Sequence, residues 1–275
     1  MTLDEYPPQE PFTAIGARYH DEVLRRGGSV RGVEARYGAD PYCSLTIVPA
    51  AEPNGDVLVV FHGGGWTNGY KEWMLFMVPA LTALGITFVS AGYRLAPDHV
   101  FPVQRDDAFD AIAAVHRSIS AHGGRADRIF LGGHSAGGHL AALAALSEGW
   151  TAERHVPANA IRGALPISGT YLFGDGSGLA MRPRFLGPEA IGADHAASPV
   201  HHVRPGVPPF LVSFGSDDFP HLRRPAQVFI AALRAHGNDV TACELPGCDH
   251  LGASYASGDF DFDWGRMAAA WMREH

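Results

Sequence analysis

Residues 133–137 read Gly-His-Ser-Ala-Gly, and Ser135 in the middle is a candidate nucleophile. The pentapeptide follows a short apolar run at 128–132 and precedes a helix-like run at 138–146. A strand, this pattern and a helix, in that order, predict a sharp turn that presents the serine hydroxyl, because the glycines remove side-chain atoms that would clash there. The alternative is an ordinary glycine-rich turn with no catalytic role.

A serine hydroxyl is a good nucleophile only when a histidine takes its proton and a carboxylate orients that histidine. Among the fifteen histidines, His250 directly follows the last predicted strand, residues 239–245, and we expect it to be the base. Two candidate acids, Asp217 and Asp218, come just after the preceding predicted strand, residues 209–215. We expect the acid to be Asp218, on the pattern of residues that follows it.

Three consecutive glycines follow another predicted buried strand, residues 56–61, within the run His-Gly-Gly-Gly-Trp at 62–66. Such a loop can turn main-chain N–H groups toward a ligand, and in acyl transfer these groups stabilise the negative charge that develops on the carbonyl oxygen. We expect the N–H groups of Gly64, Gly65 and Ala136 to form this oxyanion hole. A phosphate-binding loop is the alternative, but no Gly-Lys-Ser/Thr sequence follows.

The stretch 171–207 has little periodicity and much Gly, Pro and His, which is typical of a functional loop or an insertion. We predict a partial lid over the site. Trp66, Tyr171 and Phe173 are candidate substrate-binding residues, with core packing as the alternative for each. The amphipathic stretch 12–26 is expected to form a helix that packs across the mouth of the site or covers a sheet edge.

Strand-like and helix-like stretches alternate along the chain, which predicts an α/β class: a mostly parallel central sheet with helices on both faces. The predicted strands are residues 33–37, 43–48, 56–61, 86–91, 128–131, 160–167, 209–215 and 239–245, and the predicted helices are 12–26, 70–84, 103–120, 222–236 and 263–273. Both glycine-rich loops follow strands, so we expect them to meet at the carboxyl edge of the sheet. Residues 1–275 are predicted to form a single domain, in which 1–26 are an N-terminal arm and helix, the arm being loosely held over 1–11.

Two acidic residues, Asp106 and Asp107, fall in the first turn of the predicted helix 103–120. A carboxylate in the first turn of a helix interacts favourably with the helix dipole. We assign that structural role to both residues.

The composition narrows the classes of partner. The chain has 275 residues, a formal net charge of −8 and no long basic run, so we expect no nucleic acid to bind. No apolar stretch reaches membrane-spanning length, and the first residues lack the pattern of a signal peptide, which predicts a cytoplasmic protein without membrane contact. Three cysteines match no zinc site, and His195, His201 and His202 have no carboxylate or cysteine pattern beside them, so no metal is expected.

Taken together, the motifs resemble the α/β-hydrolase superfamily over nearly the whole chain, including the order serine, acid, histidine. The glycine loop at 62–65 and Tyr-Arg-Leu-Ala-Pro at 93–97 resemble the hormone-sensitive-lipase-type esterases. The serine turn has His134 where that group usually has aspartate, and so is more similar to the kynurenine formamidase (arylformamidase) and feruloyl-esterase-like branch. Ser-Gly-Thr-Tyr at 168–171 and Ser-Pro-Val at 198–200 fit that branch too, although Leu-Phe follows the first where formamidases often have an acidic residue and leucine.

The resemblance implies a serine hydrolase that cleaves a small carboxylic ester or an N-formyl aryl amide through an acyl-enzyme. No metal or organic cofactor is needed for this chemistry. Specific hydrolysis of N-formylkynurenine is one alternative. A non-catalytic small-molecule-binding protein of the same fold is another, against which stand the three candidates Ser135, Asp218 and His250.

Overall fold

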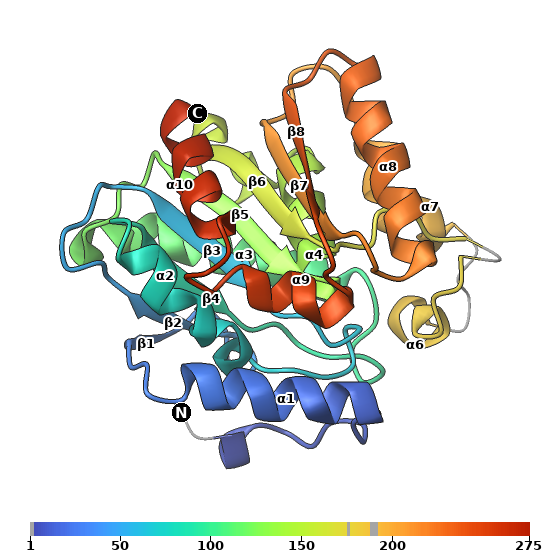
Figure 1. The fold of residues 1–275 in the computed structure, drawn as a ribbon, viewed down its shortest axis with the longest axis horizontal. Coiled ribbons are helices and arrows are strands. Elements are labelled where there is room, and N and C mark those ends of the chain that lie inside the picture. Colours follow the sequence, from blue (N-terminus) through green and yellow to red (C-terminus); the bar gives the residue numbers. More distant parts are fainter. Residues whose placement is uncertain (1–2, 175–176, 188–191) are drawn as a thin grey trace.

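The strands form one eight-stranded sheet in a computed structural model that describes residues 3–174, 177–187 and 192–275 (Figure 1). The strands are β1 (Val33–Arg36), β2 (Ser44–Val48), β3 (Val57–Phe61), β4 (Thr87–Ala91), β5 (Ile129–His134), β6 (Ile161–Ile167), β7 (Phe210–Gly215) and β8 (Val240–Leu245). Their order is β1-β2-β4-β3-β5-β6-β7-β8, and β2 alone runs antiparallel to its neighbours. The predicted α/β class with a mostly parallel sheet is confirmed.

Helices cover both faces of the sheet (Figure 1). They are α1 (Ala14–Gly27), α2 (Val78–Thr82), α3 (Val103–Ser118), α4 (Ala136–Leu146), α5 (Trp150–Glu153), α6 (Arg182–Leu186), α7 (Ala193–Ala197), α8 (Pro220–Ala235), α9 (His250–Ala256) and α10 (Trp264–Glu274). Short 3-10 helices are η1 (Leu3–Glu5), η2 (Lys71–Met77), η3 (Ile119–His122), η4 (Ala158–Ala160) and η5 (Pro199–His202).

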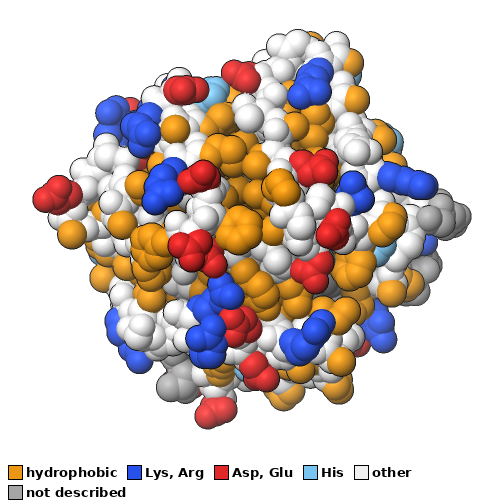
Figure 2. Space-filling view, in the orientation of Figure 1, with side chains coloured by type: hydrophobic (Ala, Val, Ile, Leu, Met, Phe, Trp, Pro, Cys, Tyr) orange, Lys and Arg blue, Asp and Glu red, His pale blue; other side chains and the backbone are white. Residues whose placement is uncertain are grey.

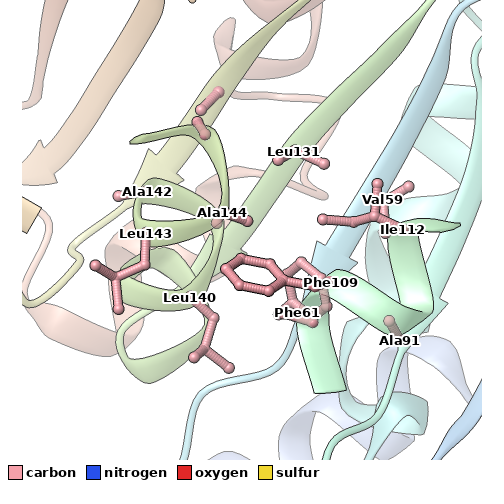
Figure 3. Packing of buried hydrophobic residues seen from close by; sticks show 14 of the residues in the cluster. Val59, Phe61, Ala91, Phe109, Ile112, Leu131, Leu140, Ala142, Leu143 and Ala144 are labelled. Atoms are coloured by element: carbon pink, nitrogen blue, oxygen red, sulfur yellow. The ribbon is translucent and has the colours of Figure 1, made fainter. Parts of the chain in front are cut away.

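The central strand β3 is buried along its whole length because its side chains alternate between two apolar layers. Val57, Val59 and Phe61 pack into the layer that contains α3, α4 and α8, whereas Leu58 and Val60 pack into the layer that contains α1, η2, α2, α9 and α10. Figure 3 shows the first layer, in which Val59 and Phe61 lie beside side chains from α3 and α4. This packing fixes the carboxyl end of β3, where the glycine loop begins.

The predicted helix 70–84 is instead a 3-10 helix, η2, followed by the five-residue helix α2. Pro79 stands at the second position of α2, and a proline there is compatible with a helix start but not with a helix interior. Within the stretch 171–207 the structure has α6, α7 and η5. Parts of the predicted lid, residues 175–176 and 188–191, lie outside the described residues.

The N-terminal arm is held by hydrogen bonds, contrary to the expectation of a loosely held segment over 1–11. The Gln9 amide donates to the Gly69 carbonyl and accepts from the Gly69 N–H, both at 2.8 Å. Asn68 donates to the Glu10 carbonyl at 2.6 Å. Apolar burial holds the arm as well, because Tyr6 is buried in the core and its ring lies 4.9 Å from that of Tyr42.

Near this arm lies Lys71, whose side chain is fully buried (0% exposed). Its ammonium group pairs with Glu34 at 2.8 Å and with Glu72 at 2.6 Å. Two carboxylates offset the cost of burying the charge.

On the face shown in Figure 2, apolar side chains gather between charged ones. Phe260 and Phe262, which are 58% and 39% exposed, line a hollow of about 220 Å³ beside α2 and α10.

Within the described part of the chain, no helix combines the length and apolar character that crossing a membrane requires.

Candidate active site

Ser135 lies at a sharp turn between β5 and α4, as predicted. Its φ of 56° falls in the left-handed region, which is strained for a residue with a side chain. The flanking glycines permit the turn: a Cβ on Gly137 would lie 1.9 Å from the Phe61 carbonyl oxygen, and one on Gly133 would lie 2.5 Å from the main chain of Gly137. The turn therefore requires glycine on both sides of the serine.

The imidazole of His250 joins Ser135 and Asp218. Its Nε2 lies 3.1 Å from Ser135 Oγ, and its Nδ1 lies 2.9 Å from Asp218 Oδ1. His250 begins α9 just after β8, and Asp218 follows β7. The other acid candidate, Asp217, is exposed and contacts Ser216 instead. The structure thus brings together the three predicted side chains, which are far apart in the sequence.

The carboxylate of Asp218 is held in its ionised form. Burial alone would raise the pKa of Asp218, but hydrogen bonding to His250 and the nearby imidazole charge bring this pKa below its usual value. The main-chain N–H of Phe219 also donates to Oδ1 at 2.6 Å. An ionised carboxylate only accepts hydrogen bonds, so His250 Nδ1 carries a proton, and in the neutral imidazole Nε2 is then free to accept one from Ser135.

The glycine loop lies beside the serine. A Cβ on Gly63 would lie 3.3 Å from Ser135 Cβ and 3.1 Å from the His134 carbonyl oxygen, so a side chain there would be crowded. Gly64 and Gly65 have φ values of 106° and 62°. Within the described residues, the N–H groups of Gly64, Gly65 and Ala136 have no hydrogen-bond partner, which leaves them available to a ligand.

A cavity of about 180 Å³ opens beside Ser135 and His250. Its other lining residues are Phe12, Thr13, Ile15, Gly16, Tyr19, Gly64, Gly65, Asn68, Trp73, His134, Met181 and Leu251. None of these described lining residues is Asp, Glu, Lys or Arg. The start of α1, the start of α9 and the segment before α6 converge around it (Figure 1). The cavity is therefore mostly apolar, and α1 packs across the mouth of the site, which was one of its two predicted placements.

The three predicted substrate-binding residues do not line this cavity. Trp66 stacks on Phe185 with ring centroids 4.1 Å apart, and Phe173 packs against Trp66 at 5.5 Å. Tyr171 stacks on Phe229 of α8 at 4.6 Å. All three predicted residues are buried in the core. Each of these rings packs against another aromatic ring in the core. Residues of α1 and η2, together with Met181, form much of the cavity wall instead.

The three histidines His195, His201 and His202 lie near one another, and the rings of the first two stack at 4.4 Å. Among the residues that the structure describes, no group of three or more His, Cys, Asp or Glu side chains is arranged to hold a metal ion.

Comparison with known proteins places these features in a family. Residues 58–253 match the family model described as alpha/beta hydrolase fold. The esterases LipQ and LipC of Mycobacterium tuberculosis (strain ATCC 25618 / H37Rv) are each 33% identical to the chain, over 70% and 90% of its length. A kynurenine formamidase of Salmo salar is 28% identical over 71% of the chain. The matches cover 49%, 64% and 65% of these relatives, so the chain spans only about half to two thirds of their length.

Solved structures show the same fold. The carboxylesterase EstE1, cloned from a metagenomic library, superposes with a TM-score of 0.75 and 23% identity, covering 94% of this chain and 95% of that one. An esterase of Pyrobaculum calidifontis superposes with a TM-score of 0.77 and 21% identity, covering 94% and 92%. With its sheet order, its serine turn and the match over 58–253, the chain belongs to the alpha/beta-hydrolase family.

Proposed function

We propose that the protein is a serine carboxylesterase that hydrolyses small, uncharged esters. The observation that carries this proposal is the imidazole of His250, which lies within hydrogen-bond distance of both Ser135 and Asp218 at the edge of an apolar cavity. The likeness to the mycobacterial esterases supports the same reaction class.

In this mechanism Ser135 attacks the carbonyl carbon of the ester while His250 Nε2 takes the hydroxyl proton. Asp218 orients the ring and stabilises the imidazolium. His250 then gives the proton to the departing alcohol oxygen, leaving an acyl group on Ser135. A water molecule, deprotonated by His250, attacks the acyl-enzyme, and His250 returns that proton to Ser135 Oγ as the bond to the acyl carbon breaks and the carboxylic acid leaves.

The negative charge on the carbonyl oxygen is stabilised by the N–H groups of Gly64, Gly65 and Ala136. These groups are unpaired among the described residues, so they need not break an existing hydrogen bond before they donate to the substrate oxygen. One such donor contributes about 3 kcal/mol to lowering the barrier.

The cavity favours an uncharged ester over N-formylkynurenine. That formamide carries an ammonium and a carboxylate group, and no charged aspartate, glutamate, lysine or arginine side chain is found among the described lining residues to pair with either. The formamide remains the second candidate, because His134 stands before the serine and a kynurenine formamidase is among the relatives.

Two assays test the proposal. Replacement S135A should abolish hydrolysis of p-nitrophenyl acetate and labelling by a fluorophosphonate probe while the protein stays folded. Full turnover by S135A would refute it, and a wild-type protein that neither turns over nor labels would be a binding protein instead. Comparing kcat/KM for p-nitrophenyl acetate and N-formylkynurenine then decides between an ester and a formamide substrate. A tenfold preference for either is decisive, since it equals about 1.4 kcal/mol of transition-state stabilisation.

A further inference from the structure

His134, the residue before the nucleophile, has no role in the mechanism above, yet it contacts the base. It is buried, at 3% exposed. Its ring centroid lies 4.5 Å from that of His250, and its Nε2 lies 2.9 Å from the main-chain carbonyl oxygen of His250. Because a carbonyl oxygen only accepts hydrogen bonds, His134 Nε2 must carry the proton and donate it.

The His134 ring is in one tautomer near pH 7, with its proton on Nε2. Burial, followed by the charge of His250, lowers the pKa of His134 to about 3, so the ring is neutral near pH 7. A neutral imidazole has one N–H, which the carbonyl places on Nε2. The other nitrogen, Nδ1, is buried and has no hydrogen-bond partner within the described part of the chain.

The bond joins the loop before α9 directly to the serine turn, two parts of the site that the sheet connects only through β6, β7 and β8. The loop before α9 is fastened to the acid's side: Gly247 N–H donates to Ser216 Oγ at 2.8 Å, and Asp217 N–H donates to the Cys248 carbonyl at 3.0 Å. Among the described residues, the bond from His134 is the one hydrogen bond from this loop and the start of α9 to β5 and the serine turn, besides the contact between His250 and Ser135 itself.

We propose that His134 is a positioning residue, whose Nε2–H bond to the carbonyl of His250 sets the distance between base and nucleophile. His134 and Ser135 are neighbours, with Cα atoms about 3.8 Å apart, so the bond ties the backbone of the base directly to the backbone of the nucleophile. The inference rests on the proposed function, because it requires Ser135 and His250 to react together. A displacement of about 1 Å between reacting groups can cost on the order of 100-fold in rate.

Three replacements at this position separate the bond from the ring. The amide nitrogen of glutamine reaches the place of histidine Nε2, whereas that of asparagine reaches only the place of Nδ1. We expect H134Q to keep kcat for p-nitrophenyl acetate within about threefold of wild type. H134N and H134L should lower kcat and the rate of fluorophosphonate labelling by about 10- to 100-fold, with KM changed less than about threefold. If His134 served only as part of the cavity wall, its replacement would raise KM and leave kcat unchanged.

A second buried histidine is the matched control. His139 is also buried, and its Nε2 lies 2.7 Å from the Ala197 carbonyl, away from the base. H139Q and H139N should lower the melting temperature without lowering kcat at 25 °C by more than about twofold. An equal kcat loss in the His139 variants would mean general damage to the core and would overturn the inference.

The Gln–Asn comparison decides the result even if H134L fails to fold. Equal kcat values for folded H134Q and H134N, whether high or low, would contradict a role for the Nε2 bond. The S135A result keeps this separate from the proposed function: inactive S135A with fully active H134N rejects only the positioning role, whereas active S135A rejects the mechanism itself.

Discussion

The phenol of Tyr93 donates a hydrogen bond of 2.8 Å to the main-chain carbonyl of His62, and the two rings stack with centroids 4.3 Å apart. His62 directly precedes the glycine loop that we assign to the oxyanion hole. A second bond, from Ala96 N–H to the Trp66 carbonyl at 2.9 Å, joins the same two loops at the other end. The loop after β4 therefore supports the glycine loop at both of its ends.

Replacing Tyr93 by phenylalanine should remove that support. The carbonyl of His62 then loses a buried partner, which costs about 1–3 kcal/mol of unfolding free energy, and a less rigid glycine loop should lower kcat several-fold. Tyr37→Phe is the control. The Tyr37 phenol also donates to a main-chain carbonyl, at 2.7 Å, but that carbonyl belongs to Gly92 and not to the residue before the glycine loop. Urea unfolding and steady-state kinetics measure both effects, and equal kcat losses in the two variants would argue against loop support.

Asp107 has a different role from the helix-dipole role that we assigned to it. Its carboxylate binds Arg94 Nη2 at 2.6 Å and also accepts from the Arg94 main-chain N–H at 2.9 Å. Asp107→Ala should lower the unfolding free energy by about 3 kcal/mol, the lower end for a buried pair because the Arg94 side chain is 32% exposed. Asp106→Ala, at a carboxylate 40% exposed beside Arg105, should change it by less than about 1 kcal/mol. Similar losses in urea unfolding would contradict this difference.

The two neighbouring acids should differ sharply in kinetics. Asp218→Asn should lower kcat by about 10⁴-fold, because an amide no longer holds His250 in the tautomer that accepts the serine proton. Asp217 is exposed and does not contact His250, so Asp217→Asn should change kcat by less than about threefold. A larger loss from Asp217→Asn in p-nitrophenyl acetate hydrolysis would reverse the assignment.

The size of the cavity should set the length of the acyl chain. Gly16 and Met181 both line it. Gly16→Leu should narrow the cavity and lower the ratio of kcat/KM for hexanoate over acetate esters at least about tenfold, since each buried methylene contributes about 0.8 kcal/mol. Met181→Ala should widen it and raise that ratio. If neither variant moves the ratio, the acyl chain does not enter this cavity.

Acid should destabilise the fold through three buried histidines. Burial lowers the pKa of His62 to about 4 and that of His134 and His139 to about 3, whereas in the unfolded chain each has its usual value near 6.5. Between those values the unfolded state binds more protons, so stability is full above about pH 6.5 and falls as the pH drops toward 4. Each histidine contributes up to about 1.4 kcal/mol per pH unit, measured by urea unfolding from pH 7 to 5. H139Q should reduce the slope of unfolding free energy against pH by the contribution of one histidine. A wild-type unfolding free energy that does not change between pH 7 and 5 would contradict the prediction.

Several features followed from the sequence because local pattern determines them. A strand buried on both faces, such as β3, must be continuously apolar, and the serine turn needs its glycines for steric reasons. His250 was found by its position after the last strand, since the carboxyl ends of neighbouring parallel strands meet at one edge. The contact of His250 with Ser135 and Asp218 agrees with that reasoning.

Other features depend on contacts between distant segments. The spacing of residues within an irregular loop does not show whether an aromatic ring faces a cavity or the core. We therefore predicted Trp66, Tyr171 and Phe173 at the substrate site, whereas the structure has them in the core. Asp107 looked like an ordinary first-turn acid because its partner, Arg94, lies in a preceding loop. The attachment of Gln9 to Gly69 uses one amide side chain and leaves no periodic signal.

The buried ion pairs of Lys71 have a practical consequence. Lys71 is the single lysine of the chain, and its side chain is fully enclosed. Succinimidyl esters and aldehyde resins attach to accessible lysine amines, so in the folded protein they find no lysine to react with. Coupling to a support through a lysine side chain therefore needs a lysine introduced on the surface, and a position away from the cavity would leave the mouth of the cavity open to substrate.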